Sequence, residues 1–198
     1  MLRGSSSLYL FWCLLAIPAG LLLWRWTGEA EPWLADYIAD TGLWSARLLI
    51  VALCLTPLRQ LIGHQPWLNW LVRHRRAIGV AAFFYLLLHL ALYVVDMADL
   101  QLILDEALVP SILAGWIGLT AMTGPALASN DGAMRLLGRN WKPVQRLAYV
   151  AGFATLIHWL LVHDGRTEAI LHFLPLVLLQ LIRLVRGFFP PMNVRSST

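Results

Sequence analysis

Long uncharged stretches constrain this chain more than any other feature. Residues 4–24, 77–95 and 107–128 contain no Asp, Glu, Lys or Arg. Each stretch approaches the ~20 residues that a helix needs to cross a bilayer core of ~30 Å. Charged residues make up only 13% of the chain and hydrophobic residues 59%. This composition excludes an ordinary water-soluble globule.

Three further segments bring the number of expected membrane spans to six. Residues 41–58 are long enough, although Arg47 lies near one end. Residues 144–163 and 169–185 have shorter apolar centres and become spans if their flanking cations snorkel to the interface. We therefore predict an all-α fold, an integral membrane bundle of six transmembrane helices that forms a single domain over residues 1–198.

The charges between the expected spans indicate an orientation, because cytoplasmic loops are rich in Lys and Arg. Most of the basic residues fall before span 1, between spans 2 and 3, between spans 4 and 5, and after span 6: Arg3, Arg59, Arg73, Arg75, Arg76, Arg135, Arg139, Lys142, Arg146, Arg183, Arg186 and Arg195. The opposite loops hold most of the acids: Glu29, Glu31, Asp36, Asp40, Asp96, Asp99, Asp105, Glu106, Asp164 and Glu168. Both termini are thus expected in the cytoplasm, with the chain in the bacterial inner membrane.

The same distribution indicates which partners to expect. The net charge of +4 comes from short loops between spans. It is a topology signal rather than a nucleic-acid surface, and arginines at the rim are expected to contact membrane lipid. No internal repeat, nucleotide-binding glycine motif or soluble extension is visible, so any chemistry is expected in or at the bilayer. Cys13 and Cys54 fall inside spans and give no disulfide or zinc framework.

Histidines are the remaining candidates for chemistry, because a polar ring inside hydrocarbon is costly unless it is used. His89 lies thirteen positions after Arg76, and His158 lies twelve after Arg146. Both expected spans run outward from the cytoplasm, which places the two imidazoles ~18–20 Å from the basic face. Two imidazoles at one depth on neighbouring helices suit the axial ligands of a b-type haem.

Other interpretations of these residues stay open. Each histidine would also be satisfied by a hydrogen bond to a carbonyl, a hydroxyl or water. His172, about one turn into the last span, reaches a similar layer and would replace either ligand or contact a haem edge. Tyr85, Tyr93 and Trp159 flank the ligands and are interpreted as contacts of a haem edge. The two other histidines, His64 and His163, are expected in a loop and at the rim.

The chain resembles the MsrQ (YedZ) family within the ferric-reductase-like transmembrane superfamily. The resemblance rests on an ordered set of residues: Thr56-Pro57-Leu58, Arg75-Arg76-Ala77-Ile78-Gly79, Tyr85-x-x-x-His89, Tyr93, Ser129-Asn130, Arg135-Leu136-Leu137-Gly138, Trp141, Leu147, Tyr149 and Ile157-His158-Trp159. It covers most of the chain.

This resemblance implies a b-type cytochrome of the inner membrane. Such a protein passes electrons from the quinone pool, or from a cytoplasmic flavin reductase through bound FMN, to MsrP, a periplasmic molybdopterin enzyme that reduces methionine sulfoxide in oxidised proteins. His89 and His158 match the family's positions for binding haem iron. Gln145 stands where the family has another fifth-span histidine. A second haem would therefore need a different ligand, such as His74.

Two other classes of function remain open. A ferric or other small-molecule reductase of the same superfamily would bind haem without a protein acceptor. A haem-free transporter or membrane scaffold would use the histidines for protons or packing, although the spans lack carboxylates and paired breaks.

Overall fold

The computed structural model describes residues 3–162 and 165–188, and these residues form helices and short connections with no strand. The bounds of the helices are α1 Arg3–Gly28, α2 Leu34–Ile62, α3 Pro66–Met97, α4 Leu100–Glu106, α5 Pro110–Leu127, α6 Asp131–Leu137, the 3₁₀ turn η1 Gly138–Asn140, α7 Trp141–Val162 and α8 Arg166–Phe188. The predicted all-α membrane bundle is confirmed. Residue 163, at the end of the expected fifth span, and Arg195 lie outside the described residues.

Five of the helical segments are long and apolar enough to cross a membrane. They are Leu8–Gly28, Leu34–Ile62, Pro66–Met97, Asp131–Val162 and Arg166–Arg186. The expected span at 107–128 differs, because α4 and α5 pass as a span only together and are bent by 100°. Pro110 opens α5 and holds Val109 in an extended conformation, so the helix begins at residue 110 rather than 107.

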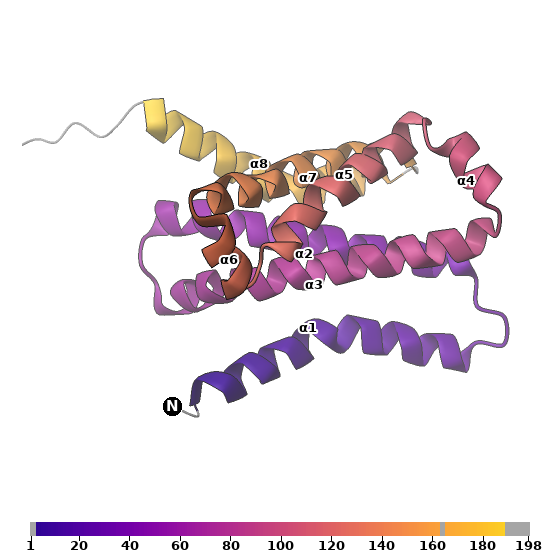
Figure 1. Ribbon diagram of the computed structural model, residues 1–198, viewed down its shortest axis with the longest axis horizontal. Coiled ribbons are helices and arrows are strands. Elements are labelled where there is room, and N and C mark those ends of the chain that lie inside the picture. The colour runs from indigo at the N-terminus through magenta and orange to yellow at the C-terminus, as the bar shows by residue number, and fades with distance from the viewer. Residues whose placement is uncertain (1–2, 163–164, 189–198) are drawn as a thin grey trace, which may run out of the picture.

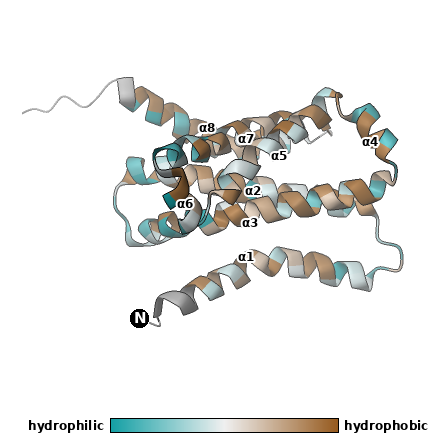
Figure 2. Cartoon of the chain, in the orientation of Figure 1, coloured by the Kyte–Doolittle hydropathy of each residue, from teal (hydrophilic) through white to brown (hydrophobic). Residues whose placement is uncertain are grey.

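The helices run antiparallel between two chemically different ends (Figure 1). We call the end at which α2 begins and α3 stops the acidic end; it holds Asp36, Asp40, Asp96 and Asp99. The basic end, where α2 stops and α3 begins, holds Arg59, Arg73, Arg75 and Arg76. Figure 2 shows apolar residues along the helices and more polar residues in the connections at both ends.

Two helix hairpins form the centre of the bundle. One is α2 with α3 and the other is α5 with α7, and each pair makes extensive contact along its length. Helix α8 packs against α2 and α7, while α1 lies beside α3. Near the middle of the bundle the hairpins and α8 meet in an apolar core formed by Leu49, Ile50, Leu53, Ala82, Met122, Ala151, Phe173 and Leu176.

Tyr85 joins α1 to the rest of the bundle. Its hydroxyl accepts a hydrogen bond from the Ala19 amide and donates one to the Leu15 carbonyl, both at 2.9 Å. In a regular helix that amide and carbonyl would bond each other. They lie beside Pro18, which has no amide hydrogen and at which helices bend. The tyrosine thus satisfies backbone groups of α1, whereas the sequence led us to expect its hydroxyl beside the ligands.

Candidate functional site

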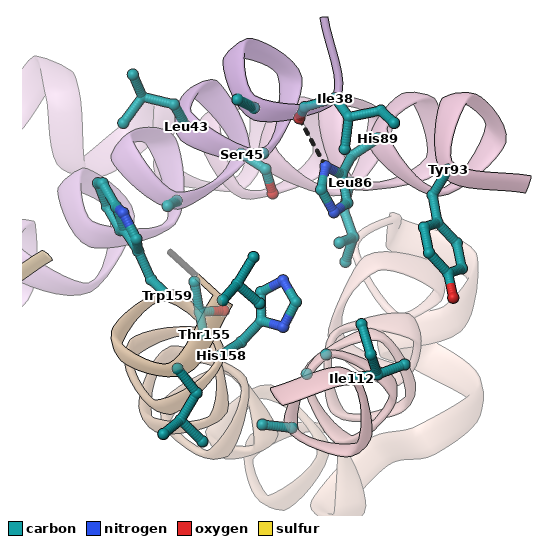
Figure 3. Close-up of a pocket in the computed structure, with 18 of the residues that line it drawn as sticks. Ile38, Leu43, Ser45, Leu86, His89, Tyr93, Ile112, Thr155, His158 and Trp159 are labelled. Carbon is teal, nitrogen blue, oxygen red and sulfur yellow. Dashed lines mark hydrogen bonds between the residues drawn. The ribbon is translucent and has the colours of Figure 1, made fainter. Parts of the chain in front are cut away.

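A cavity of about 1040 Å³ lies between the two hairpins in the half nearer the acidic end. This volume is at the upper end of the range of small-molecule and cofactor pockets. Its walls come from α2, α3, α5, α7 and the start of α8. Figure 3 shows His89 and His158 pointing into it from different helices, with Ser45, Leu86 and Thr155 nearby.

The two histidines of the expected ligand pair face each other across this cavity. Their ring centres are 6.2 Å apart and their planes are nearly perpendicular, at 85°. Residues 69 positions apart in the sequence are therefore brought together at one depth of the bundle, as their distances from the basic segments predict.

His89 is held by the helix beside it. Its Nδ1 lies 2.8 Å from the carbonyl oxygen of Ile38 in α2 (Figure 3). A carbonyl oxygen only accepts, so Nδ1 carries the hydrogen and Nε2 carries the lone pair. One turn further along α2 is Gly42, where a Cβ atom would lie 2.9 Å from Nδ1 and 3.1 Å from Cε1 of this ring.

His158 is held in the same way by α5. Its Nδ1 lies 2.7 Å from the carbonyl oxygen of Ser111. Gly115 is again one turn further along the helix, and a Cβ atom there would lie 3.1 Å from Nδ1 and 3.2 Å from Cε1 of His158. We call the carbonyl with the glycine four residues later a glycine cradle. The two hairpins carry one each, a structural repeat that the sequence does not display.

The geometry of the pair fits two imidazoles on one metal ion. A metal–imidazole bond is about 2.0 Å long, and a ring nitrogen lies about 1.1 Å from the ring centre. Two imidazoles opposite each other on one ion would thus have their centres about 6.2 Å apart, which agrees with the observed 6.2 Å. In both rings the lone pair is on Nε2, and haem iron accepts such ligands. The residues present fit a bis-histidine haem.

Most of the other wall residues are apolar, although Asp40, Arg166 and Glu168 also line the cavity. The buried Tyr93 hydroxyl and Trp116 indole N–H in this wall have no hydrogen-bond partner among the described residues. Ser45 donates its hydroxyl to the Ala82 carbonyl at 2.9 Å, and Thr155 donates to the Ala151 carbonyl at 2.8 Å. Tyr93 and Trp159 line the cavity, in agreement with their expected positions beside the ligands.

His172 does not line the cavity. Its Nδ1 lies 2.8 Å from the Glu168 carbonyl, and its Nε2 lies 3.2 Å from Nε of Arg47 in α2. Since the guanidinium only donates, the lone pair of this imidazole is occupied by Arg47. The ring also lies 5.1 Å from that of Trp159. His172 therefore connects α8 to α2 through Arg47 and also contacts Trp159, a residue of the cavity wall.

His74 and Gln145, the residues relevant to a second haem, have other partners. His74 lies between α1 and α3, with Nδ1 2.8 Å from the Trp70 carbonyl and its ring 5.0 Å from that of Phe11. Gln145 donates through Nε2 to the Pro125 carbonyl of α5, at 3.1 Å.

His64 does not line the cavity. His64 is in the connection between α2 and α3, and His163 lies outside the described residues. No group of three or more His, Cys, Asp or Glu side chains that would hold a metal ion occurs in residues 3–162 and 165–188.

Sequence reasoning missed the two cradle glycines. Gly42 and Gly115 lie inside apolar helices, where glycine also marks ordinary close helix packing. One signal was present: glycine within a helix costs about 1 kcal/mol relative to alanine, so it calls for a packing or functional reason.

The comparisons with known proteins agree with this geometry. Residues 41–161 match the family model described as ferric reductase like transmembrane component. A protein of Xanthomonas oryzae pv. oryzae named protein-methionine-sulfoxide reductase heme-binding subunit MsrQ is 36% identical over 166 residues, which cover 77% of this chain and 74% of that protein. A protein of Brucella ovis with the same name is 36% identical over 151 residues, 74% of this chain and 66% of that protein.

No solved structure matches the chain significantly. The family match covers four of the helices around the cavity and both histidines that face each other there, while α1 and α8 lie outside it. The two relatives extend the similarity over most of the chain at more than a third identity. The protein belongs to the MsrQ family of ferric-reductase-like transmembrane proteins.

Proposed function

We propose that this protein is a b-type cytochrome subunit that passes electrons across the bacterial inner membrane to a periplasmic methionine sulfoxide reductase catalytic subunit of the MsrP type. The observation that carries the proposal is the 6.2 Å separation of the His89 and His158 rings, with both Nδ1 atoms bonded to carbonyls. The names of the relatives, as haem-binding subunits, support it.

His89 and His158 would hold the iron through Nε2. The haem, when bound, supplies a one-electron couple whose potential depends on its axial ligands and its burial. The protein contributes the rest: the Ile38 and Ser111 carbonyls fix the tautomer of each ring, and mostly apolar side chains surround the space between the rings. Such outer hydrogen bonds also raise the basicity of the ligating nitrogen.

We propose a single haem in this chain. In related proteins with a second one, the ligand on α7 would occupy the position of Gln145, which here bonds to the Pro125 carbonyl. His74, the other candidate ligand for a second haem, packs on the α1 side of α3, with its ring 5.0 Å from that of Phe11.

The charged residues at the two ends of the bundle support an outward direction of electron transfer. Arginines concentrated at the basic end support a cytoplasmic location for that end and for both termini, by the positive-inside rule. Electrons then enter from the quinone pool or from a cytoplasmic flavin reductase, with FMN held near those arginines. The acidic end faces the periplasm, where Asp36, Asp96 and Asp99 provide a surface for the acceptor protein.

The absorbance of reduced haem b in the purified protein tests the site. His89→Ala and His158→Ala should each abolish it, whereas His64→Ala, in a connecting segment, should keep it. Full retention of the absorbance in both pocket variants would refute the ligand assignment.

The acceptor needs a separate test. The reduced protein in lipid vesicles is mixed with a periplasmic methionine sulfoxide reductase catalytic subunit or with a ferric chelate, and oxidation of the cytochrome is followed optically. Faster oxidation by the protein acceptor, slowed by high salt, supports the proposal. Oxidation by the ferric chelate alone would instead identify a small-molecule reductase.

A further inference from the structure

We propose that Gly42 and Gly115 are positioning residues that set the two iron-binding imidazoles. The inference rests on the proposed function, since it assumes that His89 and His158 bind haem iron. It adds that the position of each ring depends on the missing side chain of a glycine on the neighbouring helix.

The contact at Gly42 is closer than a side chain permits. A Cβ atom there would lie 2.9 Å from Nδ1 of His89, and real Cβ atoms essentially never approach a neighbour within 3.0 Å. The ring cannot move away freely, because the same Nδ1 is bonded to Ile38 one turn earlier on α2. An added methyl group would therefore compete directly with this hydrogen bond.

The contact at Gly115 repeats the arrangement on the other hairpin. A Cβ atom would lie 3.1 Å from Nδ1 of His158, which is also bonded to the carbonyl four residues earlier, in Ser111. Two separate helices thus present glycine and carbonyl at the same spacing to the same two atoms of an imidazole. Close helix packing alone would not place a bonded carbonyl and, four residues later, a glycine against the histidine ring in both hairpins.

Other glycines in the helices show that the contact is particular to the histidines. Around Gly20 in α1 and Gly79 in α3 no neighbouring atom lies within 4 Å of the Cβ position. At Gly118 the contacts are ordinary, beginning at 3.7 Å. Gly152 has an equally short contact of 2.9 Å, but with the flexible end of Leu53.

The role we assign follows from these contacts. The absence of a side chain lets each imidazole approach the helix backbone closely enough to bond a carbonyl, and this bond fixes the ring that would face the iron. Loss of such an outer partner typically weakens metal binding about 10- to 100-fold. Both ligand orientation and iron affinity should therefore respond to a methyl group at residue 42 or 115.

The test compares Gly42→Ala and Gly115→Ala with two controls, Gly79→Ala and Gly152→Ala. The readouts are haem affinity, the visible spectrum and the electron paramagnetic resonance signal of the oxidised protein, which reports the orientation of axial ligands. We expect Gly42→Ala to weaken haem binding at least tenfold, Gly115→Ala to weaken it less, and both to change the resonance signal. Gly79→Ala should match the parent protein, and Gly152→Ala should lower stability while keeping the parent spectra.

Some outcomes would overturn the inference. It fails if Gly42→Ala and Gly115→Ala bind haem with the parent affinity and spectra while His89→Ala and His158→Ala lose it. It also fails if Gly152→Ala changes the spectra as much as Gly42→Ala does. Retention of haem by the histidine variants would refute the proposed function and this inference with it.

A second comparison separates ring positioning from folding. His89→Gly, alone and combined with Gly42→Ala, is supplied with free imidazole as a replacement ligand. A ring without a tether can shift away from the new methyl group, so the two proteins should bind haem within threefold of each other. A tenfold deficit in the double variant would show that the methyl group acts on the fold, which contradicts a positioning role.

Discussion

Replacing Tyr85 by phenylalanine should loosen α1 without altering the haem site. The change removes the hydroxyl that joins the Ala19 amide and the Leu15 carbonyl, two hydrogen bonds of 2.9 Å. A hydrogen bond contributes about 0.5–1.5 kcal/mol net in proteins and averages about 0.6 kcal/mol in a measured membrane bundle. We therefore expect Tyr85→Phe to lower the free energy of unfolding by about 1–3 kcal/mol.

The measurement is the free energy of unfolding in mixed micelles, followed by helical circular dichroism, together with the visible spectrum of the haem-loaded protein. Tyr9→Phe is the matched control, because Tyr9 lies in α1 and its side chain is 71% exposed. Equal stability of the two variants, within about 0.5 kcal/mol, would refute the reasoning. A changed haem spectrum in Tyr85→Phe would also refute it, since Tyr85 does not line the cavity.

Three further variants test other parts of the bundle. Gln145→His should leave the haem-to-protein ratio at that of a single haem, because His74, the other candidate ligand, packs against Phe11 of α1; a doubled ratio would contradict this. His172→Ala should keep the haem absorbance and lower the free energy of unfolding by about 1 kcal/mol through the lost bond to Arg47; loss of haem would make His172 a ligand. Arg76→Gln removes an exposed ion pair with Asp131 at 2.7 Å, so its cost should be below about 1 kcal/mol and vanish in 1 M salt; a larger cost that is independent of salt would contradict it.

The large-scale architecture could be predicted because it depends on composition over whole segments. An uncharged stretch indicates a span wherever the stretch is long enough to cross the bilayer. The described helices contain nearly all of the stretches that the sequence analysis identified. The facing of His89 and His158 was predictable as well, because helices have a fixed rise and both distances start from the same basic face.

Local details depended on contacts between distant residues, which a pattern in one segment does not contain. The sequence suggests that Tyr85, one turn from His89, lies beside the haem, but its hydroxyl turns to α1 instead. Whether the Nε2 lone pair of His172 is available to bind iron depends on Arg47, 125 positions away, which donates a hydrogen bond to it. The start of α5 could have been read from Pro110, but the size of the bend between α4 and α5, 100°, could not.

The two glycine cradles have a consequence for how the protein is made. The first cradle and its histidine lie within residues 38–89 and the second within residues 111–158. Each hairpin therefore holds one imidazole in its final tautomer without help from the other, and the first hairpin is synthesised before the second. Neither hairpin would then need to rearrange during biogenesis. Haem would bind last, between two hairpins that already hold their histidines, and its binding would require that both hairpins have been inserted into the membrane.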